Sequence, residues 1–403
     1  MECRICRSTD LTDCINLGEQ YITSRWPDYG DFSTPKTSIV LCLCGSCGLL
    51  QLRGTTPSSE LYEHQYGYRS GISNTMRTHL KSYQEEILSK VAVSPGDMVV
   101  DIGSNDSTML QMYSSELIRV GIDPTGSQFH RFYREVELIA DYFTKATFQS
   151  AYGLAKPKIV SSIAMFYDLP DPVQFAKDIY DILHDDGIWT CEQSYLPSML
   201  ETNSVDTICH EHLEYYGITQ VHEIAKRAGF TIVDISLNSS NGGSFRVYFK
   251  KSGTEAPSLA TYLEKEKNLK NIATYTEFMV RVDAQVAKLR SIVSDAKAAG
   301  KECWIYGAST KGNCLLQYAG FKESDLPFAV ERNLDKIGKM TSIGSKIISE
   351  DEMRNNPPAY LLVLPWHFRT EIIERESAYI SSGGTLLFPL PECIKTSTTL
   401  PKY

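Results

Sequence analysis

The stretch MVVDIGSNDSTMLQMY, residues 98–113, decides the predicted fold. It begins as an apolar strand that ends at Asp101, turns through Gly103 and is expected to continue as a helix. A segment with helical spacing of apolar residues, 73–97, precedes this strand, and a second strand ends near Asp123. Strands and helices that alternate at this spacing are typical of a parallel, doubly wound α/β sheet.

The alternation continues through the rest of the chain. A third strand is expected within 157–169, a helix from about Val173 to Leu183, and later strands within 187–196, 230–238 and 243–250. From 258 to 301 the chain is mostly charged and helical, as expected of a connector helix or a pair of helices. A second α/β pattern begins at 302 and continues through 326–333, 359–368 and 383–392. With 403 residues, the chain is expected to form two or three domains.

Charge and hydropathy exclude some classes of partner. The chain has 40 Lys+Arg against 49 Asp+Glu, a net charge of -9, and no run of basic residues, which speaks against nucleic acid as a partner. The N-terminus lacks the apolar core of a signal peptide, and no stretch contains eighteen consecutive apolar residues. We therefore expect a cytoplasmic protein that has no membrane partner.

The cysteines cluster near the N-terminus. Six of the eleven lie within the first 47 residues, and two pairs form the knuckles CRIC, with Cys3 and Cys6, and CGSC, with Cys44 and Cys47. A strand at 37–44 is expected to deliver the second knuckle. Four thiolates at this spacing can close a tetrahedron around one Zn²⁺ and leave no open position, which predicts a structural zinc. Buried or redox-active thiols are the alternative.

The first α/β unit carries a cofactor signal. Asp101 and Gly103 stand at the carboxyl edge of the sheet, where the backbone approaches a ligand, and Asp123 ends the neighbouring strand, where an acid can bind ribose hydroxyls. The pattern is not G-x-G-x-x-G, because Asn105 replaces the second glycine and leaves less room for a pyrophosphate. S-adenosylmethionine, which has a ribose and no phosphate, fits better. The alternative is that these residues only shape a strand-to-helix turn.

The segment DTICHEHLEYY, residues 206–216, contains two histidines that flank an acid. Residues two apart share a face only in extended chain, so His210 and His212 would point the same way on a strand or loop. Metal ligation is disfavoured, because HEH is not HExxH and no third ligand follows at helical spacing. A catalytic histidine and a structural histidine both remain open.

The second α/β pattern contains candidates for phosphate binding. The loop GASTKG, residues 307–312, should open a helix, so its N–H groups and Lys311 could hold a diphosphate. Arg332 and Trp366 also follow predicted strands, where a phosphate could pair or a base could stack. A surface arginine and a core tryptophan are the alternatives, and the glycines of 241–248 suit either a close approach of the backbone or a tight turn.

The motifs in combination resemble a known family. Their order, a four-cysteine module followed by DIGSND, DTICHEHLEYY, NGGSFRVY, GASTKG and VLPWHF, is similar to that of the sugar C-methyltransferases that act on nucleotide-linked 4-keto-deoxyhexoses. The resemblance covers nearly the whole chain. It implies a zinc-binding domain at 1–70, a Rossmann-like class I domain that binds S-adenosylmethionine at 71–255, and a second Rossmann-like domain that holds the nucleotide sugar at 256–403.

The resemblance also assigns roles to residues. His212 matches the catalytic base of the family, Glu211 an acidic partner, and Tyr66 or Tyr68 an aromatic hydroxyl that approaches the cofactor with a serine, here Ser70. The base would remove a proton beside the ketone and form an enolate, which attacks the sulfonium methyl group. The other candidate site residues are His210 and Asp168 for catalysis, Ser104 with Asp101, Gly103, Asn105 and Asp123 for the cofactor, and Asn241 with Lys311, Arg332 and Trp366 for the substrate.

Two positions depart from the family pattern. Cys209 replaces a tyrosine just before HEH, and Tyr167 and Asp168 stand where the family has a histidine. Both positions face the reacting sugar in the family, so the acceptor sugar and the methylated atom stay open. O- or N-methylation of a related nucleotide sugar is one alternative. A zinc-ribbon protein that binds RNA or a protein partner is another, which the acidic balance disfavours.

Overall fold

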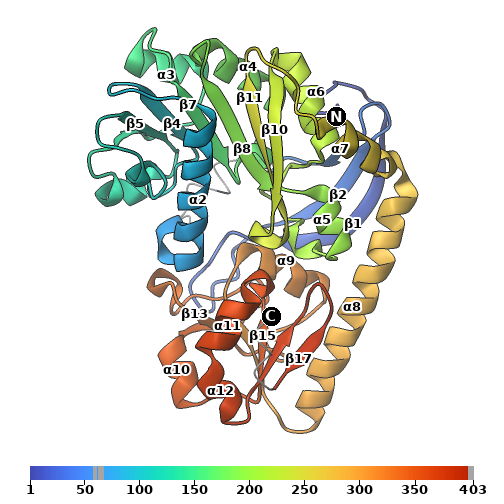
Figure 1. Ribbon diagram of the computed structural model, residues 1–403. Coiled ribbons are helices and arrows are strands. Elements are labelled where there is room, and N and C mark those ends of the chain that lie inside the picture. Colours follow the sequence, from blue (N-terminus) through green and yellow to red (C-terminus); the bar gives the residue numbers. More distant parts are fainter. Residues whose placement is uncertain (58–60, 62–67, 398–403) are drawn as a thin grey trace.

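The computed structural model describes residues 1–57, 61 and 68–397, which form three sheets joined by helices (Figure 1). The first sheet is antiparallel, with strands in the order β1-β2-β3-β9. Its strands are β1 (Leu11–Tyr21), β2 (Lys36–Cys44), β3 (Leu50–Leu52) and β9 (Glu214–Tyr215). Because β9 belongs to the two-histidine segment, this sheet holds that segment against the N-terminal residues.

The second sheet has seven strands in the order β10-β11-β8-β7-β4-β5-β6. They are β4 (Met98–Ile102), β5 (Ile118–Ile122), β6 (Glu137–Ile139), β7 (Ile159–Ile163), β8 (Ile188–Ser194), β10 (Thr231–Asn238) and β11 (Ser244–Lys250). β4 to β8 are parallel, whereas β11 runs antiparallel to both β8 and β10. The sheet expected to be parallel is therefore mixed.

Helices on both faces of the second sheet bury its strands (Figure 1). They are α2 (Asn74–Lys90), α3 (Lys145–Tyr152), α4 (Pro172–Ile182) and α6 (Ile218–Ala228). The short helix α5 (Leu196–Glu201) instead packs into the core shared with the first and third sheets. All five residues of β4 are buried, as in strands covered on two faces. The predicted helix at 173–183 is confirmed as α4, which begins with a cap by Asp171 and a proline at its first position.

The helix expected after Gly103 is not formed. Asn105 and Ser107 have φ angles of 50° and 59°, which the right-handed helix cannot accommodate, and only a short 3-10 turn follows at Leu110–Met112. The chain after β4 is therefore a loop at the carboxyl edge of the sheet.

The third sheet has six strands in the order β14-β13-β12-β15-β16-β17. They are β12 (Cys303–Tyr306), β13 (Phe328–Glu331), β14 (Lys346–Ser349), β15 (Tyr360–Val363), β16 (Thr385–Phe388) and β17 (Ile394–Thr396), and only β17 is antiparallel to its neighbour. The accompanying helices are α9 (Thr310–Tyr318), α10 (Glu350–Asn355), α11 (Arg369–Arg375) and α12 (Ser377–Ser381). The second Rossmann-like unit is thus confirmed.

A helical connector joins the second and third sheets, as the charged segment predicted. It consists of α7 (Leu259–Lys265) and the 27-residue α8 (Ile272–Ala298), which runs along one side of the molecule (Figure 1). Residues of the first sheet, α8 and the third sheet share one hydrophobic core. None of the described helices is both long and apolar enough to cross a membrane.

Candidate active site

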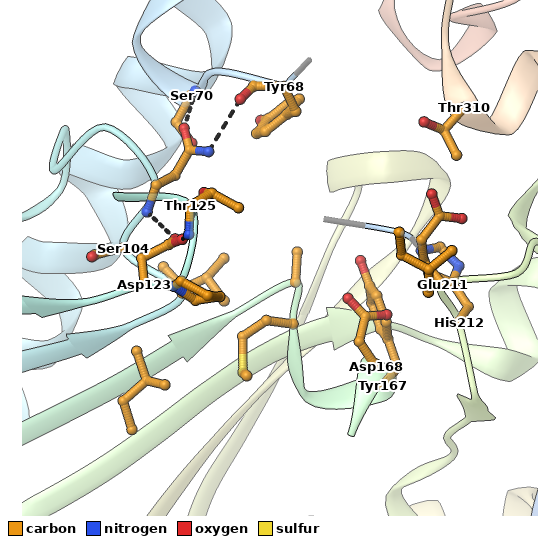
Figure 2. Close-up of a pocket in the computed structure, with 18 of the residues that line it drawn as sticks. Tyr68, Ser70, Ser104, Asp123, Thr125, Tyr167, Asp168, Glu211, His212 and Thr310 are labelled. Carbon is orange, nitrogen blue, oxygen red and sulfur yellow. Dashed lines mark hydrogen bonds between the residues drawn. The ribbon is translucent and has the colours of Figure 1, made fainter. Parts of the chain in front are cut away.

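One cavity of about 1050 Å³ opens between the three sheets. Its wall includes residues from 55–57, 101–105, 122–125, 163–171, 209–213, 308–311 and 331–336, together with Glu192, Asn241 and His367. A volume at the upper end of the roughly 300–1,000 Å³ usual for ligand pockets can accommodate two ligands side by side. Figure 2 shows Asp123 and Thr125 on one side of this space, and Tyr167, Asp168, Glu211 and His212 on the other.

The loop after β4 forms the wall of the cavity on the side of the second sheet. Gly103 has a φ of 75°, and a Cβ atom there would lie 2.8 Å from Cγ of Met165, so no side chain fits. Asp101 is buried and accepts a 2.6 Å hydrogen bond from Oγ of Ser161. Burial, together with the nearby charge of Asp123, raises the pKa of Asp101 to about 7.

Asp123 is fixed in place at the end of β5. Its Oδ2 accepts from the backbone N–H of Asn105 at 2.8 Å, and its Oδ1 accepts from the N–H and the hydroxyl of Thr125 at 2.7 and 2.6 Å. A carboxylate offers about four acceptor positions, so one remains for a hydroxyl group of a ligand. Asp123 lines the cavity, and this arrangement suits a ribose.

The side chain of Asn105 holds a neighbouring segment over the same loop. Its Nδ2 donates to the carbonyl oxygen of Tyr68 at 3.1 Å, and its Oδ1 accepts from the N–H of Ser70 at 3.0 Å (Figure 2). The side chain of Asn105 therefore anchors the segment at Tyr68 and Ser70, which a glycine at this position could not do. Tyr68 and Ser70 both line the cavity, whereas Tyr66 lies outside the described residues. Ser104 also lines the cavity and is hydrogen-bonded to the hydroxyl of Tyr133 at 2.8 Å.

If Asp123 binds the cofactor ribose, Asp123→Ala is expected to weaken binding of S-adenosylmethionine by about 1.5–3 kcal/mol, the value of hydrogen bonds to a charged group. The dissociation constant should rise roughly 10- to 150-fold, measured by calorimetry. Asp141→Ala removes an exposed carboxylate nearby in the sequence and serves as the control. Equal affinity of Asp123→Ala and wild type would reject the ribose assignment.

His212 lies in the cavity wall and is 9% exposed. Its Nδ1 is 2.6 Å from the carbonyl oxygen of Thr207, and since a carbonyl can only accept, Nδ1 carries the proton. Nε2 is then left with its lone pair. Burial and the charge of Lys311 lower the pKa of His212 to about 3, well below the ordinary value for an imidazole. The imidazole is therefore a neutral proton acceptor at physiological pH.

Glu211 lines the cavity and His210 does not, although both side chains lie near the hydroxyl of Thr23. Glu211 lines the cavity, and its Oε2 accepts from the hydroxyl of Thr23 at 3.4 Å. His210 is fully buried against the first sheet, with Nε2 3.5 Å from the carbonyl oxygen of Thr37, and it does not line the cavity. The expectation that both histidines of this loop share a face is wrong, because the chain bends between them.

The two positions that depart from the family pattern meet beside His212. Tyr167 and Asp168 follow β7 and line the cavity, and the ring of Tyr167 packs against that of His212 with centroids 4.2 Å apart. Cys209 also contributes to the wall, and burial raises the pKa of its thiol well above the ordinary value. A neutral thiol is a small apolar surface rather than a nucleophile here.

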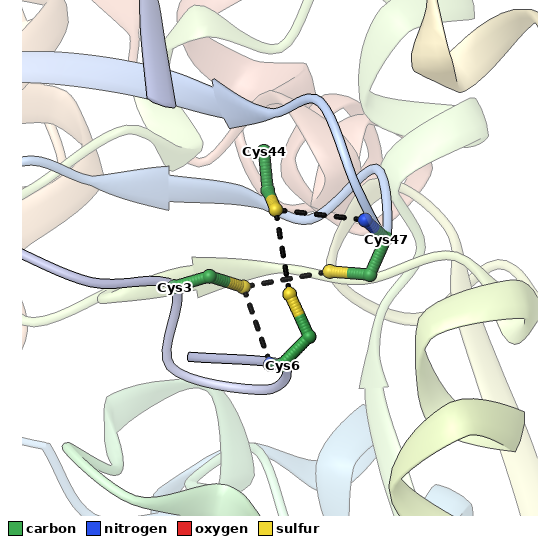
Figure 3. A group of neighbouring side chains, drawn as sticks. All are labelled: Cys3, Cys6, Cys44 and Cys47. Atoms are coloured by element: carbon green, nitrogen blue, oxygen red, sulfur yellow. Dashed lines mark hydrogen bonds between the residues drawn. The ribbon is translucent and has the colours of Figure 1, made fainter. Parts of the chain in front are cut away.

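The four cysteines of the two knuckles meet at the edge of the first sheet (Figure 3). Their sulfur atoms all lie within 4.8 Å of one another, with 3.4 Å between Cys3 and Cys47 and 3.6 Å between Cys6 and Cys44. Thiolates around zinc at about 2.3 Å in a tetrahedron lie about 3.8 Å apart. The cluster therefore fits one zinc ion. Among the described residues, these four cysteines are the group whose ligand atoms lie close enough together to hold a metal ion.

The third sheet forms the opposite wall of the cavity. Ser309 caps α9 by accepting from the N–H of Gly312 at 3.0 Å. The first residues of this helix, Thr310 and Lys311, line the cavity, which places the positive end of the helix dipole there. Nζ of Lys311 is 3.5 Å from the carbonyl oxygen of Asn241, whose φ is 54°. Burial lowers the pKa of Lys311, while the charge of Asp206 opposes the shift.

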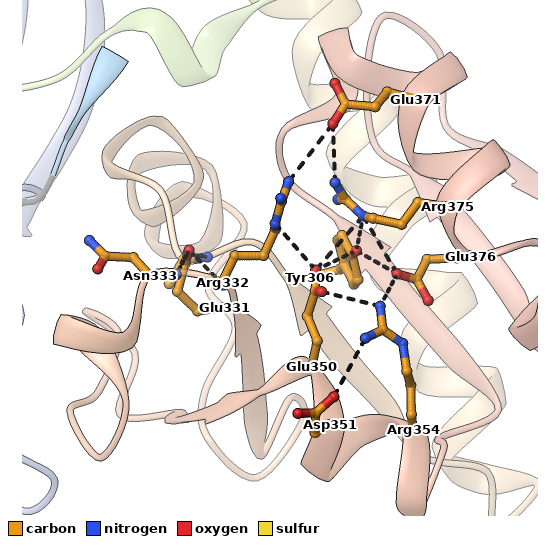
Figure 4. A network of polar contacts seen from close by, with 11 residues as sticks. Tyr306, Glu331, Arg332, Asn333, Glu350, Asp351, Arg354, Glu371, Arg375 and Glu376 are labelled. Carbon is orange, nitrogen blue, oxygen red and sulfur yellow. Dashed lines mark hydrogen bonds and ion pairs between the residues drawn. The ribbon is translucent and has the colours of Figure 1, made fainter. Parts of the chain in front are cut away.

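Arg332 connects the cavity to a network of charged residues (Figure 4). Its guanidinium is 3.9 Å from Glu350 and 3.8 Å from Glu371, distances at which these pairs are weak. The network contains closer contacts at its centre, where the Tyr306 hydroxyl donates to Glu376 at 2.7 Å. Arg332 is therefore the member of this network best placed to pair with an anion in the cavity.

Trp366 occupies a different position from the one predicted. Its indole N–H donates to Asp206 at 2.9 Å, its ring lies against Gly242, and it does not line the cavity. Trp366 packs between the second and third sheets, in agreement with the alternative interpretation of a core tryptophan. The next residue, His367, does line the cavity, and burial together with Lys311 lowers its pKa to about 3.

Sequence reasoning also missed Glu192. This residue of β8 is 3% exposed, lines the cavity and lies 2.5 Å from Nε2 of His79. Burial tends to raise its pKa, but His79 and Arg246 lower it, so the carboxylate stays charged. Periodicity could not find it, because Glu192 sits within a strand that is buried on both faces, and its partners come from α2 and β11.

Comparison with known proteins covers nearly the whole chain. Family models match residues 3–62, 76–235 and 239–391, with the respective descriptions "Putative zinc binding domain", "Methyltransferase domain" and "C-methyltransferase C-terminal domain". The chain is 28% identical to the C-methyltransferase NovU of Streptomyces niveus over 405 residues, which cover 97% of this chain and 96% of that protein.

Part of the chain is also similar to solved structures of methyltransferases. The N-methyltransferase NodS of Bradyrhizobium japonicum has 12% identity and a TM-score of 0.33, covering 45% of this chain and 99% of that chain. The magnesium protoporphyrin IX methyltransferase of Synechocystis, solved with bound S-adenosylmethionine, has 12% identity and a TM-score of 0.33, covering 44% and 79%.

The family models, the similarity to NovU and the four-cysteine cluster define an S-adenosylmethionine-dependent methyltransferase with a zinc-binding N-terminal domain. More particularly, the third of the matching family models describes a C-methyltransferase C-terminal domain, and the chain is similar to the C-methyltransferase NovU along its length. The resemblance inferred from the order of the motifs is thereby confirmed, as are both expected cofactors, S-adenosylmethionine and zinc.

Proposed function

We propose that the protein transfers a methyl group from S-adenosylmethionine to a carbon of a nucleotide-linked 4-keto-deoxysugar. The observation that carries this proposal is the shared cavity. The fixed carboxylate of Asp123, the neutral imidazole of His212 and the cation of Lys311 all line one space of about 1050 Å³. A cofactor, a base and an anion-binding wall in contact with the same space suit a reaction between two bound molecules.

The proposed chemistry begins with removal of a proton. Nε2 of His212 accepts the proton from the carbon next to the ketone, and the electrons of the C–H bond pass into the carbonyl group to give an enolate. S-adenosylmethionine, when bound, supplies a methyl group activated by its sulfonium. The enolate carbon would take up that methyl group, and the electron pair of the broken S–CH₃ bond would remain on sulfur.

The surroundings of His212 support its role as a base. Nδ1–H donates to the carbonyl oxygen of Thr207, which stabilises the imidazolium once Nε2 has gained a proton. Burial and, to a smaller extent, the charge of Lys311 lower the pKa of the imidazole in the free enzyme. A diphosphate held by Lys311 would offset this charge, so we expect the base to become stronger when the nucleotide sugar is bound.

The substrate class follows from the wall formed by the third sheet. The N-terminus of α9, Lys311 and Arg332 provide N–H groups and cations for a diphosphate. His367 and Asn241 line the cavity beside Lys311 and could contact the diphosphate or the sugar. On this basis the partner is a nucleoside diphosphate sugar, with its sugar directed toward His212.

A product analysis tests the proposal. The enzyme is incubated with S-adenosylmethionine labelled in the methyl carbon and with a panel of thymidine, uridine and guanosine diphosphate 4-keto sugars. We expect one labelled product whose NMR spectrum places the methyl group on carbon. A methyl group on oxygen or nitrogen would support the O- or N-methyltransferase alternative, and stabilisation by RNA alone would point to the binding-protein alternative.

A further inference from the structure

Arg4 links the first zinc knuckle to the segment that carries His212. It lies between Cys3 and Cys6 and is 5% exposed. Its Nη1 donates to the carbonyl oxygen of Leu52 at 2.8 Å and to that of Leu213 at 3.4 Å. The guanidinium therefore reaches from the knuckle to the residue directly after His212.

The rest of the guanidinium contacts the cavity wall and a buried acid. Nη2 donates to the carbonyl oxygen of Gly54 at 3.1 Å and to the hydroxyl of Thr55 at 2.8 Å. Nε lies 3.5 Å from Oε1 of Glu214, which is 1% exposed. Thr55 lines the cavity, and Glu214 follows His212 by two residues. One side chain thus contacts both the segment that follows His212 and the cavity wall at Thr55.

The second knuckle is tied to the same segment. Nε2 of Gln220 donates to the carbonyl oxygens of Cys47 and Gly48 at 3.4 and 3.1 Å, while its Oε1 accepts from the N–H of Gly217 at 3.0 Å. Both knuckles therefore contact the stretch that begins at the catalytic loop and continues into α6.

The sheet pairing of this stretch is short. β9 has only two residues and pairs with β3 through Gln51 and Glu214 and through Leu50 and Tyr215. Two-residue strands provide few ladder bonds. Main-chain hydrogen bonds extend the pairing by one residue, because the N–H of Leu213 donates to the carbonyl oxygen of Tyr167 at 2.8 Å and its carbonyl oxygen accepts from the N–H of Leu52 at 2.8 Å. The Arg4 contacts to Leu213 and Glu214 add to these bonds. Arg4, with its planar set of donors, can hold several acceptors at once in a fixed geometry.

We propose that Arg4 is a positioning residue: the zinc knuckles fix its guanidinium, and its contacts to Leu213 and Glu214 hold His212 toward the cavity. The inference rests on the proposed role of His212 as base. It gives the zinc a function beyond the stability of the N-terminal domain, because the metal then sets the alignment of a catalytic group. Misplacement of such a group by about 1 Å can reduce a rate about 100-fold.

The test compares Arg4→Met with Arg7→Met. Arg7 belongs to the same knuckle but is half exposed, and it pairs with the half-exposed Asp171 at the cavity rim rather than with the segment that follows His212, which makes it a matched control. Arg4→Met is expected to retain zinc and affinity for S-adenosylmethionine, and to lower kcat about 10- to 100-fold with little change in KM. Arg7→Met should behave as wild type. Zinc is measured by metal analysis and cofactor affinity by calorimetry.

Two further variants separate positioning from folding. Arg4→Lys keeps the charge opposite Glu214 but loses the fork of donors, so partial recovery of kcat is expected. Glu214→Gln acts on the other end of the contact without touching the knuckle, and it decides the matter if Arg4→Met does not fold. A wild-type kcat in both Arg4→Met and Glu214→Gln, or an equal loss of cofactor affinity and kcat, would overturn the proposal.

Failure of this inference can be distinguished from failure of the proposed function. If wild-type enzyme methylates carbon and His212→Asn abolishes turnover, the base is established and the Arg4 variants test positioning alone. If His212→Asn remains active, the base assignment fails first. An active His212→Asn enzyme whose rate still falls on Arg4→Met would assign Arg4 to the cavity wall at Thr55 instead, which also overturns the positioning of His212.

Discussion

His212→Asn is expected to bind both S-adenosylmethionine and the nucleotide sugar but to lose turnover by about 10²–10⁴-fold, the contribution of a positioned general base. Asparagine can keep a donor toward the carbonyl oxygen of Thr207, which His212 contacts at 2.6 Å, so the loop should stay folded. It supplies no lone pair of comparable basicity on the cavity side. Calorimetry with each ligand measures whether binding is retained, and single-turnover rates measure the loss of methyl transfer.

Hydrogen exchange examines the proton-transfer step without methyl transfer. A 4-keto nucleotide sugar in D₂O with enzyme and the inert product S-adenosylhomocysteine should exchange its α-proton through the enolate in wild type, and much more slowly in His212→Asn. His210→Asn is the matched control, because His210 is buried against the first sheet and does not line the cavity. It should leave exchange nearly unchanged if the protein folds.

The contrary result would be informative. Near wild-type methylation by His212→Asn would remove His212 as base and direct attention to Asp168, which lines the cavity beside the ring of Tyr167.

The pH dependence of kcat/KM offers a second check on the state of His212. Because the pKa of His212 is lowered to about 3, the free imidazole stays neutral from neutral pH down to mildly acidic pH. Protonation of His212 in the free enzyme therefore should not reduce kcat/KM near pH 6.5.

The cofactor side of the cavity could be predicted from sequence because its signals are local. A buried strand, a glycine with positive φ and an acid at the end of the next strand are all visible as patterns, and the structure places Asp101, Gly103 and Asp123 together. The helix expected after Gly103 was wrong for a reason that periodicity does not reveal. Asn105 and Ser107 adopt positive φ angles there, and Asn105 bonds to a segment 35 residues earlier.

The side of the cavity that contains His212 and Lys311 depends on contacts between residues far apart in the chain, and such contacts leave no pattern in a single sequence. The neutral state of His212 arises from burial and from Lys311, which is about 100 residues away in the chain. The choice between Trp366 and His367 as cavity residues turns on how one short turn packs between two sheets. Likewise, Glu192 is paired by residues of α2 and β11 rather than by its sequence neighbours.

Loss of the zinc site is expected to have the largest effect on stability. Wild-type protein should contain one zinc per chain, and Cys44→Ser with Cys47→Ser should contain none, because two thiolates of four are removed. Structural zinc contributes about 10–16 kcal/mol in small zinc-finger peptides, so the knuckles should not stay ordered without it. Metal analysis gives the stoichiometry, and thermal unfolding gives the loss of stability.

Cys14→Ser with Cys42→Ser is the matched control for this variant. Both cysteines belong to the same sheet, and neither belongs to the four-cysteine cluster, so zinc content should remain at one per chain. Full zinc occupancy after loss of Cys44 and Cys47, or no zinc in wild type, would contradict the assignment. Arg4 lies within the first knuckle and contacts Leu213, so loss of the metal should also disturb the position of His212. We therefore expect metal loss to lower kcat more strongly than it lowers the affinity for S-adenosylmethionine.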